Sequence, residues 1–207
     1  MKQKISGDSL TSRFLEIVDI LEEESRRFWV PHIDREDGYV LASLSYYIAI
    51  LGGKVFIDTG AGIGYSTSWI MYGLSKASAN GKIYLYAIER DPARYRYLEE
   101  NVEKLKNILL SKESAVEVNV LNRDAVDFLG EEDLEIDMVF VDIEKKRYID
   151  ILRILPTKLS RIGIAVFHNA LVPGLAKEFV EFLENQDKLV HHVIPTSLGL
   201  LIVKKVT

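Results

Sequence analysis

The N-terminal part of the chain shows the spacing of apolar positions that is typical of amphipathic helices. Residues 8–28 form one such pattern, and its apolar face carries Leu10, Phe14, Ile17, Val18 and Leu21. Residues 35–51 form a second pattern, which ends at a pair of glycines. We therefore predict two helices within residues 1–52, and we expect them to cover a pocket in the core that follows.

Beyond these helices, short apolar runs alternate with amphipathic segments. The apolar runs predict strands over 54–58, 82–89, 115–121, 136–142 and 163–169, and the segments between and after them predict helices over 65–77, 92–109, 125–129, 147–159 and 174–186. Such alternation predicts an α/β fold whose parallel sheet has helices on both faces. Two last strand-like runs, 189–195 and 198–206, are joined too closely for a parallel crossover, so the last strand should be antiparallel.

Composition limits the domain count and the class of protein. With 48% hydrophobic residues and no linker rich in proline or serine, we expect a single domain over residues 1–207, divided into helices (1–52) and an α/β core (53–207). Lysine plus arginine number 26 against 31 aspartate plus glutamate, and the net charge of −5 excludes a global basic field for nucleic acid or anionic lipid.

The absence of cysteine excludes disulfides, thiolate metal sites and cysteine nucleophiles. No apolar run approaches the ~20 residues of a membrane span. We therefore expect a soluble, cytoplasmic protein with no membrane partner.

The most informative stretch is VFIDTGAGIGYSTSWI, in which a predicted strand ends at Asp58 and a glycine loop follows. In an open α/β sheet, ligands lie beyond the carboxyl ends of the strands, and glycines let the backbone approach them. Gly60, Gly62 and Gly64 are spaced G-x-G-x-G, with Tyr65 where a dinucleotide fingerprint has its third glycine. The Asp58 carboxylate would repel a pyrophosphate, whereas it attracts the methionine ammonium of S-adenosylmethionine. The loop therefore favours S-adenosylmethionine over a dinucleotide.

Two further acidic residues follow the next two predicted strands. Glu89 ends the second strand, the position from which a carboxylate accepts hydrogen bonds from both ribose hydroxyls of either ligand. Asp124 follows the third strand, where it would accept a hydrogen bond from an adenine amino group or serve equally well as the N-cap of a short helix. Spacing alone leaves both roles of Asp124 open.

Several motifs occur in an order that resembles a known enzyme family: FIDTGAGIGYSTSWI, AIERDP, NRDAVDFL, DMVFVDIEKKRYID and AVFHNALVPG. From about residue 34 to the C-terminus, the chain resembles the S-adenosylmethionine-dependent O-methyltransferases of the catechol and caffeoyl-CoA type. The G-Y-S-T continuation and the D-x-x-K-x-x-Y pattern are more specific than the glycines alone. The resemblance implies a Rossmann-like class I methyltransferase fold, in which the last of seven strands is antiparallel, and an S-adenosylmethionine-binding core over 53–207.

The resemblance also implies roles for individual residues of this sequence. Contacts to the methionine end, ribose and adenine of the cofactor are implied for Asp58, Gly60, Gly62, Gly64, Tyr65, Ser66, Glu89, Asp124, Ala125 and Asp142. Asp142 also matches the family's metal-binding aspartate, and Lys145 matches its catalytic lysine. The family's second metal carboxylate stands in an Asp-Asn pair, which reads His168-Asn169 here.

The His168-Asn169 pair changes which divalent metal the implied site would hold. Magnesium and calcium prefer oxygen ligands, whereas imidazole suits zinc, manganese, iron or nickel. A metal held by Asp142, His168 and Asn169 is therefore expected to be a transition metal. Alternatively, His168 replaces the metal and acts as a neutral base or hydrogen-bond partner for the acceptor hydroxyl. The sequence leaves both hypotheses open.

A basic run follows Asp142, and by itself it indicates solvated charges at the start of a helix. Because Asp142 lies three residues upstream at the end of a predicted strand, we expect Lys145 to be functional and Lys146 and Arg147 to be solvated. Glu144 stands where the catechol enzymes carry an aromatic wall residue, so a mammalian-type catechol is not the expected substrate.

These observations lead to one main hypothesis, the transfer of a methyl group to a hydroxyl of a small aromatic acceptor. Lys145, Asp142 and His168 are its expected catalytic residues. A tRNA hydroxyuridine-type O-methyltransferase is the first alternative, and it would need a basic path along Arg90, Arg94, Arg96, Lys145, Lys146 and Arg147. A nicotinamide (NAD)-dependent oxidoreductase and a catalytically silent binding protein are the others. We expect a small-molecule acceptor ahead of RNA as partner, and a homodimer as assembly.

Overall fold

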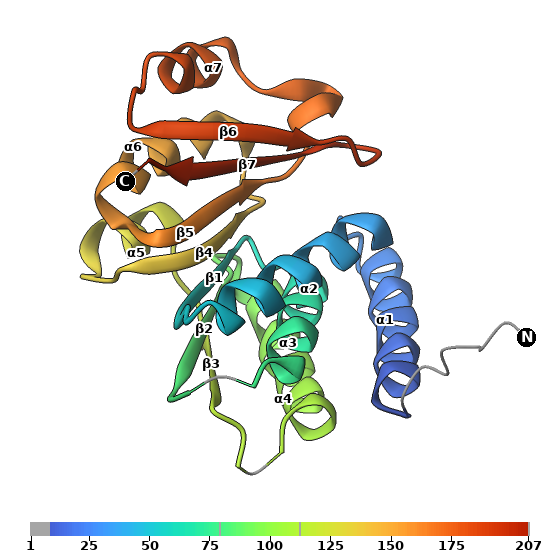
Figure 1. Cartoon of the computed structure of the whole chain (residues 1–207). Helices are drawn as coiled ribbons and strands as arrows, with labels where there is room; N and C mark the ends of the chain where they lie inside the picture. Colours follow the sequence, from blue (N-terminus) through green and yellow to red (C-terminus); the bar gives the residue numbers. More distant parts are fainter. Residues whose placement is uncertain (1–8, 79, 112, 207) are drawn as a thin grey trace, which may run out of the picture.

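The computed structural model describes residues 9–78, 80–111 and 113–206, and a seven-stranded sheet lies at its centre (Figure 1). The strands are β1 Val55–Thr59, β2 Ile83–Ile88, β3 Val116–Leu121, β4 Ile136–Val141, β5 Leu159–Phe167, β6 Leu189–Ile194 and β7 Leu200–Lys205. Their order is β3-β2-β1-β4-β5-β7-β6. The first five strands pair in parallel, and β7 is antiparallel to both β5 and β6, which confirms the predicted sheet.

Helices connect the strands and precede the first of them. The α-helices of the described residues are α1 Ser9–Arg27, α2 Arg35–Ile50, α3 Tyr65–Lys76, α4 Pro92–Leu109, α5 Ala125–Glu131, α6 Tyr148–Lys158 and α7 Lys177–Glu184. Asp8, with which the first predicted helix begins, lies outside the described residues. None of the helices described combines the length and apolar content that crossing a bilayer requires.

The segment between β5 and β6 differs from the single helix predicted over 174–186. Only α7 is α-helical, and a short turn over Ala170–Gly174 precedes it. Gly174 has φ of +92° and Leu175 is extended, so neither residue has the backbone conformation of a right-handed helix. The predicted helix was therefore too long at its N-terminal end.

Successive residues of the central strands face two apolar layers, one on each side of the sheet. Phe56 of β1 belongs to the core formed with α1 to α4, whereas the next residue, Ile57, belongs to the core formed with α5 to α7. Both side chains are fully buried. Strands buried on both faces are typical of parallel α/β sheets, and the predicted placement of helices on both faces is confirmed.

Helix α2 lies directly on α3 (Figure 1), and small residues allow the close approach. A Cβ atom on Gly73 of α3 would lie 2.2 Å from the carbonyl oxygen of Ala42 in α2. Gly38 of α2 makes room in the same way for the Trp69 ring. This contact fixes the start of α2 relative to the glycine loop, because that loop leads directly into α3.

Candidate active site

A cavity of about 250 Å³ lies beyond the carboxyl ends of the central strands. The sheet reverses its strand order between β1 and β4, and such a switch point is the usual ligand position in α/β sheets. Residues that the sequence analysis named line the cavity, namely Gly60, Glu89, Asp124, Ala125 and Asp142. The structure thus brings the ends of four strands, β1 to β4, around one cavity.

A smaller hollow shares Gly60 and Asp142 with this cavity and extends toward the N-terminal helices. Gly62, Tyr65 and Ser66 line it, together with residues 30–33 of the segment between α1 and α2. Four residues implied at the methionine end, Gly60, Gly62, Tyr65 and Ser66, therefore border a space that the N-terminal segment closes from one side, whereas the buried Asp58 lines neither hollow. Gly64 lines neither hollow.

Glycine is required at two points of the loop after β1. Gly60 has φ of +76°, and a Cβ atom there would lie 2.2 Å from the carbonyl oxygen of Asp142. Gly64 has φ of +102° and immediately precedes α3. Other residues rarely adopt this left-handed conformation. The loop therefore packs closely against the end of β4, where Asp142 lies.

Asp58 is fully buried at the end of β1. Its Oδ2 atom accepts hydrogen bonds from Ser66 Oγ at 2.8 Å and Thr67 Oγ1 at 2.5 Å, whereas Oδ1 has no partner among the described residues. The pKa of Asp58 is raised to about 7, mainly by burial and to a lesser extent by the charges of Asp142 and Glu89, while the two hydroxyls oppose the rise. A buried carboxylate oxygen without a partner is costly, so the cation or donor that this oxygen lacks is the clearest sign of a ligand here.

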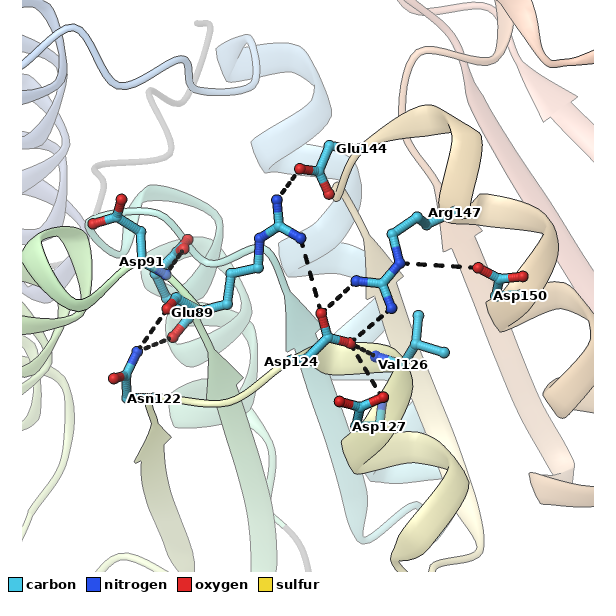
Figure 2. Close-up of polar contacts among 10 residues, drawn as sticks. Glu89, Asp91, Asn122, Asp124, Val126, Asp127, Glu144, Arg147 and Asp150 are labelled. Atoms are coloured by element: carbon cyan, nitrogen blue, oxygen red, sulfur yellow. Dashed lines mark hydrogen bonds and ion pairs between the residues drawn. The ribbon is translucent and has the colours of Figure 1, made fainter.

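Glu89 is buried at the end of β2, where both of its carboxylate oxygens accept backbone hydrogen bonds. Oε2 accepts from the Gly62 N–H at 2.9 Å, and Oε1 accepts from the Asp91 N–H at 2.8 Å. Asn122 supports this turn by donating to the Glu89 carbonyl at 2.8 Å (Figure 2). Each carboxylate oxygen keeps a lone pair for a ligand hydroxyl. Sequence analysis missed Asn122, although its place directly after β3 is a usable signal.

Asp124 is the N-cap of α5, one of the two roles that its spacing left open. Its Oδ1 atom accepts from the Val126 N–H at 2.9 Å and the Asp127 N–H at 3.3 Å. The Arg147 guanidinium also pairs with both carboxylate oxygens (Figure 2), and mainly this contact lowers the pKa of Asp124 below its usual range. The adenine contact of Asp124 stays a prediction.

The prediction that Arg147 is a solvated charge was wrong. Its side chain is only 24% exposed and lies between Asp124 and Asp150 (Figure 2). The neighbouring Arg90 pairs with Glu144 and lies 3.9 Å from Asp124. Lys146 is exposed, as expected. Asp124, Glu144, Arg90 and Arg147 therefore neutralise one another at the cavity, which Arg94 and Arg123 also line.

Lys145 reaches back across the site toward the segment after β5. Its Nζ atom donates to the carbonyl oxygens of Asn169 at 2.6 Å and Gly174 at 3.1 Å. Burial lowers the pKa of Lys145, and the charge of Asp142 opposes that shift. Asn169, implied as a metal ligand, holds Lys145 through its backbone carbonyl and adopts φ of +55°.

His168 lies between two carboxylates, one predicted and one not. Its Nδ1 atom is 3.2 Å from Asp142 Oδ1, and its Nε2 atom is 3.3 Å from Asp37 Oδ2. Burial alone lowers the pKa of His168, but the carboxylates of Asp142 and Asp37 outweigh it and raise the pKa to about 9. This shift favours the charged ring over the neutral base, and the role of His168 stays a prediction.

Asp37 is the functional candidate that sequence analysis missed. It lies in the first turn of α2 and is fully buried. The neighbouring Glu36 is also acidic but exposed, so the sequence offers no pattern that distinguishes the two. Only the packing of α2 on α3 shows which carboxylate turns toward the site.

No protein-family model matches the sequence, and no match is found among curated proteins. Solved structures do match. The O-methyltransferase TomG of Streptomyces achromogenes in complex with SAM is 18% identical, with a TM-score of 0.71 over 99% of this chain and 93% of that one. An O-methyltransferase of Bacillus cereus in complex with SAH is 17% identical, with a TM-score of 0.68 over 96% and 91%. An SAH-bound methyltransferase of Podospora anserina is 17% identical, with a TM-score of 0.71 over 97% and 89%.

At these identities the likeness shows the fold. The chain has the class I methyltransferase fold, a seven-stranded sheet with the last strand antiparallel and helices around it. The fold class predicted from the sequence is thereby confirmed.

Proposed function

We propose that the protein is an S-adenosylmethionine-dependent O-methyltransferase that acts on a hydroxyl of a small aromatic molecule. One observation carries this proposal, the buried Asp58 carboxylate whose Oδ1 atom has no partner at the glycine loop of a methyltransferase fold. Three similar structures hold SAM or SAH, which supports the same cofactor here. We treat residues 1–207 as one domain, in which 1–52 cover the pocket of the 53–207 core.

The described residues fit the cofactor. Asp58 would hold the methionine ammonium, and Glu89 would accept hydrogen bonds from the ribose hydroxyls through its free lone pairs. The methionine end would be shaped by the loop residues Gly60, Gly62, Gly64, Tyr65 and Ser66. The adenine end would be lined by Asp124 and Ala125. Asp58, Glu89 and Asp142 make the inner end of the site acidic, which suits a ligand that carries positive charge and disfavours a pyrophosphate.

Lys145 is the proposed base. When bound, S-adenosylmethionine supplies a methyl group that its positive sulfur activates. As a neutral amine, Lys145 has two N–H groups for the carbonyls of Asn169 and Gly174 and one lone pair left over. That lone pair would take the proton of the acceptor hydroxyl while the oxygen forms its bond to the methyl carbon, and the bond from that carbon to sulfur would break to leave a neutral thioether. The lowered pKa of Lys145 favours this neutral form.

The alternatives fit the charges of the site less well. Methylation of tRNA needs free cations along a path to the pocket, and three of the six predicted ones are occupied: Arg90 pairs with Glu144, Arg147 pairs with Asp124, and Lys145 donates to carbonyls. Arg94, Arg96 and Lys146 form no ion pair among the described residues, so a shorter basic path is left. An NAD-dependent oxidoreductase would place its pyrophosphate near the acidic inner end. A catalytically silent binding protein would share the cofactor contacts and lack turnover.

Calorimetric titration with S-adenosylmethionine, its demethylated product and NAD, side by side, tests the cofactor. We expect the first two to bind and NAD not to bind. Glu89→Ala should weaken cofactor binding by roughly 1.5–3 kcal/mol, the range for a hydrogen bond to a charged group. Binding of NAD alone would overturn the proposal. A panel of phenols and a check for copurifying RNA then separate small-molecule transfer, RNA methylation and silent binding.

A further inference from the structure

The imidazole ring of His168 is the centre of a buried charge cluster that links two layers of the molecule. His168 follows β5, Asp142 follows β4, and Asp37 comes from α2. The two ring nitrogens face different carboxylates, at 3.2 Å for Asp142 and 3.3 Å for Asp37. His168 is 4% exposed and Asp37 is 0% exposed, so solvent screens neither charge.

Asp37 depends on His168 for charge compensation. Neither Asp37 oxygen has an aligned hydrogen-bond donor among the described residues, and the His168 ring is the cation at ion-pair distance. The start of α2 adds the partial positive charge of a helix N-terminus. A fully buried carboxylate without a cation costs several kcal/mol. The position of Asp37 is therefore explained if His168 carries a positive charge.

The same geometry does not fit a divalent metal at the place that the family resemblance implies. A metal needs a free nitrogen lone pair, but each His168 nitrogen lies 3.2–3.3 Å from a carboxylate oxygen, where a lone pair would be repelled, although neither contact has hydrogen-bond geometry. The two carboxylates lie at opposite sides of the ring rather than converging on one point. Among residues 9–78, 80–111 and 113–206, no three His, Cys, Asp or Glu side chains are arranged to hold a metal ion.

We propose that the His168 imidazolium takes the place of the divalent cation, as a fixed charge between Asp142 and Asp37, so that this protein needs no metal. Asp37 is then a positioning residue that holds His168 from the N-terminal layer. The part that the His168 imidazolium plays in the reaction rests on the proposed function. Removal of the hydroxyl proton is left to Lys145. Acceptors with acidic hydroxyls, such as phenols, fit that chemistry best, because a fixed imidazolium cannot ligate and acidify the acceptor oxygen as a metal does.

Metal titration of the intact protein tests this proposal without any acceptor. Calorimetry and thermal unfolding with magnesium, calcium, manganese and zinc should show no binding at the site and no change in Tm. Stoichiometric binding that Asp142→Asn abolishes would overturn the proposal. S-adenosylmethionine binding is measured on the same sample, so loss of the proposed function and loss of this inference give different results.

The substitution His168→Asp should create the metal site that the native chain lacks. It leaves three carboxylates together, whose repulsion a divalent cation relieves, and we expect magnesium or manganese to raise Tm by roughly 2–8 °C. His192→Asp is the matched control, because His192 is exposed on β6 and should gain no metal dependence. A folded His168→Asp protein whose Tm ignores every cation would contradict the proposal.

Asp37→Asn tests the positioning role, and it preserves the shape of the side chain. The ring-proton NMR signal of His168 should then titrate at a lower pH than in the native protein, an effect that a merely structural residue would not cause. The chain has only 4 histidines, which makes assignment practical. An unchanged His168 titration in a folded Asp37→Asn protein would refute the role of Asp37 and with it the proposed cluster.

Discussion

Asp58 and Asp124 lie at opposite ends of one site, and each accepts hydrogen bonds from the first turn of the helix that follows its strand. Asp58 is fully buried and has no cation beside it, so its pKa rises to about 7. Asp124 is partly exposed and paired with Arg147, so its pKa falls. An aspartate thus plays opposite roles at these two positions. A carboxylate that pairs within the chain stabilises the fold, whereas one left without a cation awaits a ligand.

Loss of the proposed base, Lys145, should have the largest effect on turnover. We expect Lys145→Met to lower the methyl-transfer rate by about 10²–10⁴-fold, the usual contribution of a general base, and to leave cofactor affinity unchanged. Single-turnover assays with a phenol acceptor and calorimetry measure the two effects separately. Lys146→Met is the matched control, because its side chain is exposed and should be neutral. Normal turnover in Lys145→Met would transfer the role of base to another group.

The unpaired carboxylate should matter next. Asp58→Asn keeps the shape of the side chain but removes the charge, and we expect cofactor affinity to fall by about 10- to 150-fold, which corresponds to roughly 1.5–3 kcal/mol. Stability should stay equal or rise, since a buried uncompensated charge is lost. Calorimetric affinity together with Tm checks both statements. A lower Tm with unchanged affinity would mean that Asp58, like Asp124, stabilises the fold and does not hold the ligand.

His168 and Asp124 should also differ in the pH range in which they stabilise the fold. The folded-state pKa of His168 is raised from 6.5 to about 9. Its contribution is therefore fully present below about pH 6.5 and lost as pH rises through 9. Asp124, whose pKa is lowered, contributes above its unfolded pKa and loses that contribution in acid.

Tm measured from pH 6 to 10 checks the alkaline limb. Native protein should lose stability between pH 7 and about 9.5, and His168→Gln, less stable at pH 6, should lack that loss, so the two curves should converge at alkaline pH. If the two curves run parallel, His168 is not the group that titrates there.

The N-cap should have a modest effect on stability. Asp124→Ala should cost about 1 kcal/mol of unfolding free energy, the usual loss for a helix N-cap. We expect cofactor affinity to change by less than in Asp58→Asn. Urea unfolding and calorimetry give the two numbers. A larger affinity loss than in Asp58→Asn would reverse the order of the two ends.

The exposed pair at the rim should have the smallest effect. Arg90 and Glu144 are both about half exposed, and such pairs contribute about 0–1 kcal/mol. Arg90→Gln should therefore leave Tm nearly unchanged, and added salt should remove any difference. An effect on Tm as large as that of Asp124→Ala would show that this pair is part of the structural network.

Much of the fold could be predicted because the information is local. Strands buried on both faces read as continuous apolar runs, and the short link near Thr196 allows only an antiparallel last strand. The start of α7 could not be predicted, because residues 174–176 continue the helical spacing of apolar positions while the backbone at Gly174 does not.

Positions in the site were predictable where a residue lies at the end of its own strand, and not where side chains from distant elements meet. Asp58, Glu89 and Asp142 each lie at a strand end, and their roles toward a ligand stay predictions. Arg147 was misjudged because its partner, Asp124, lies on a different strand-to-helix connection. Asp37 was missed because its burial depends on how α2 packs on α3, which no pattern within α2 reveals.

The pair of Asp37 and His168 also sets an order of events during synthesis. The chain emerges from its N-terminus, so α2 is complete long before β5 exists, and until then Asp37 has no counterion. On a nascent chain, burial of Asp37 at the start of α2 therefore lacks its counterion until His168 has been synthesised. Contacts between such distant residues slow folding, and this contact joins α2 to the end of β5 within the candidate site.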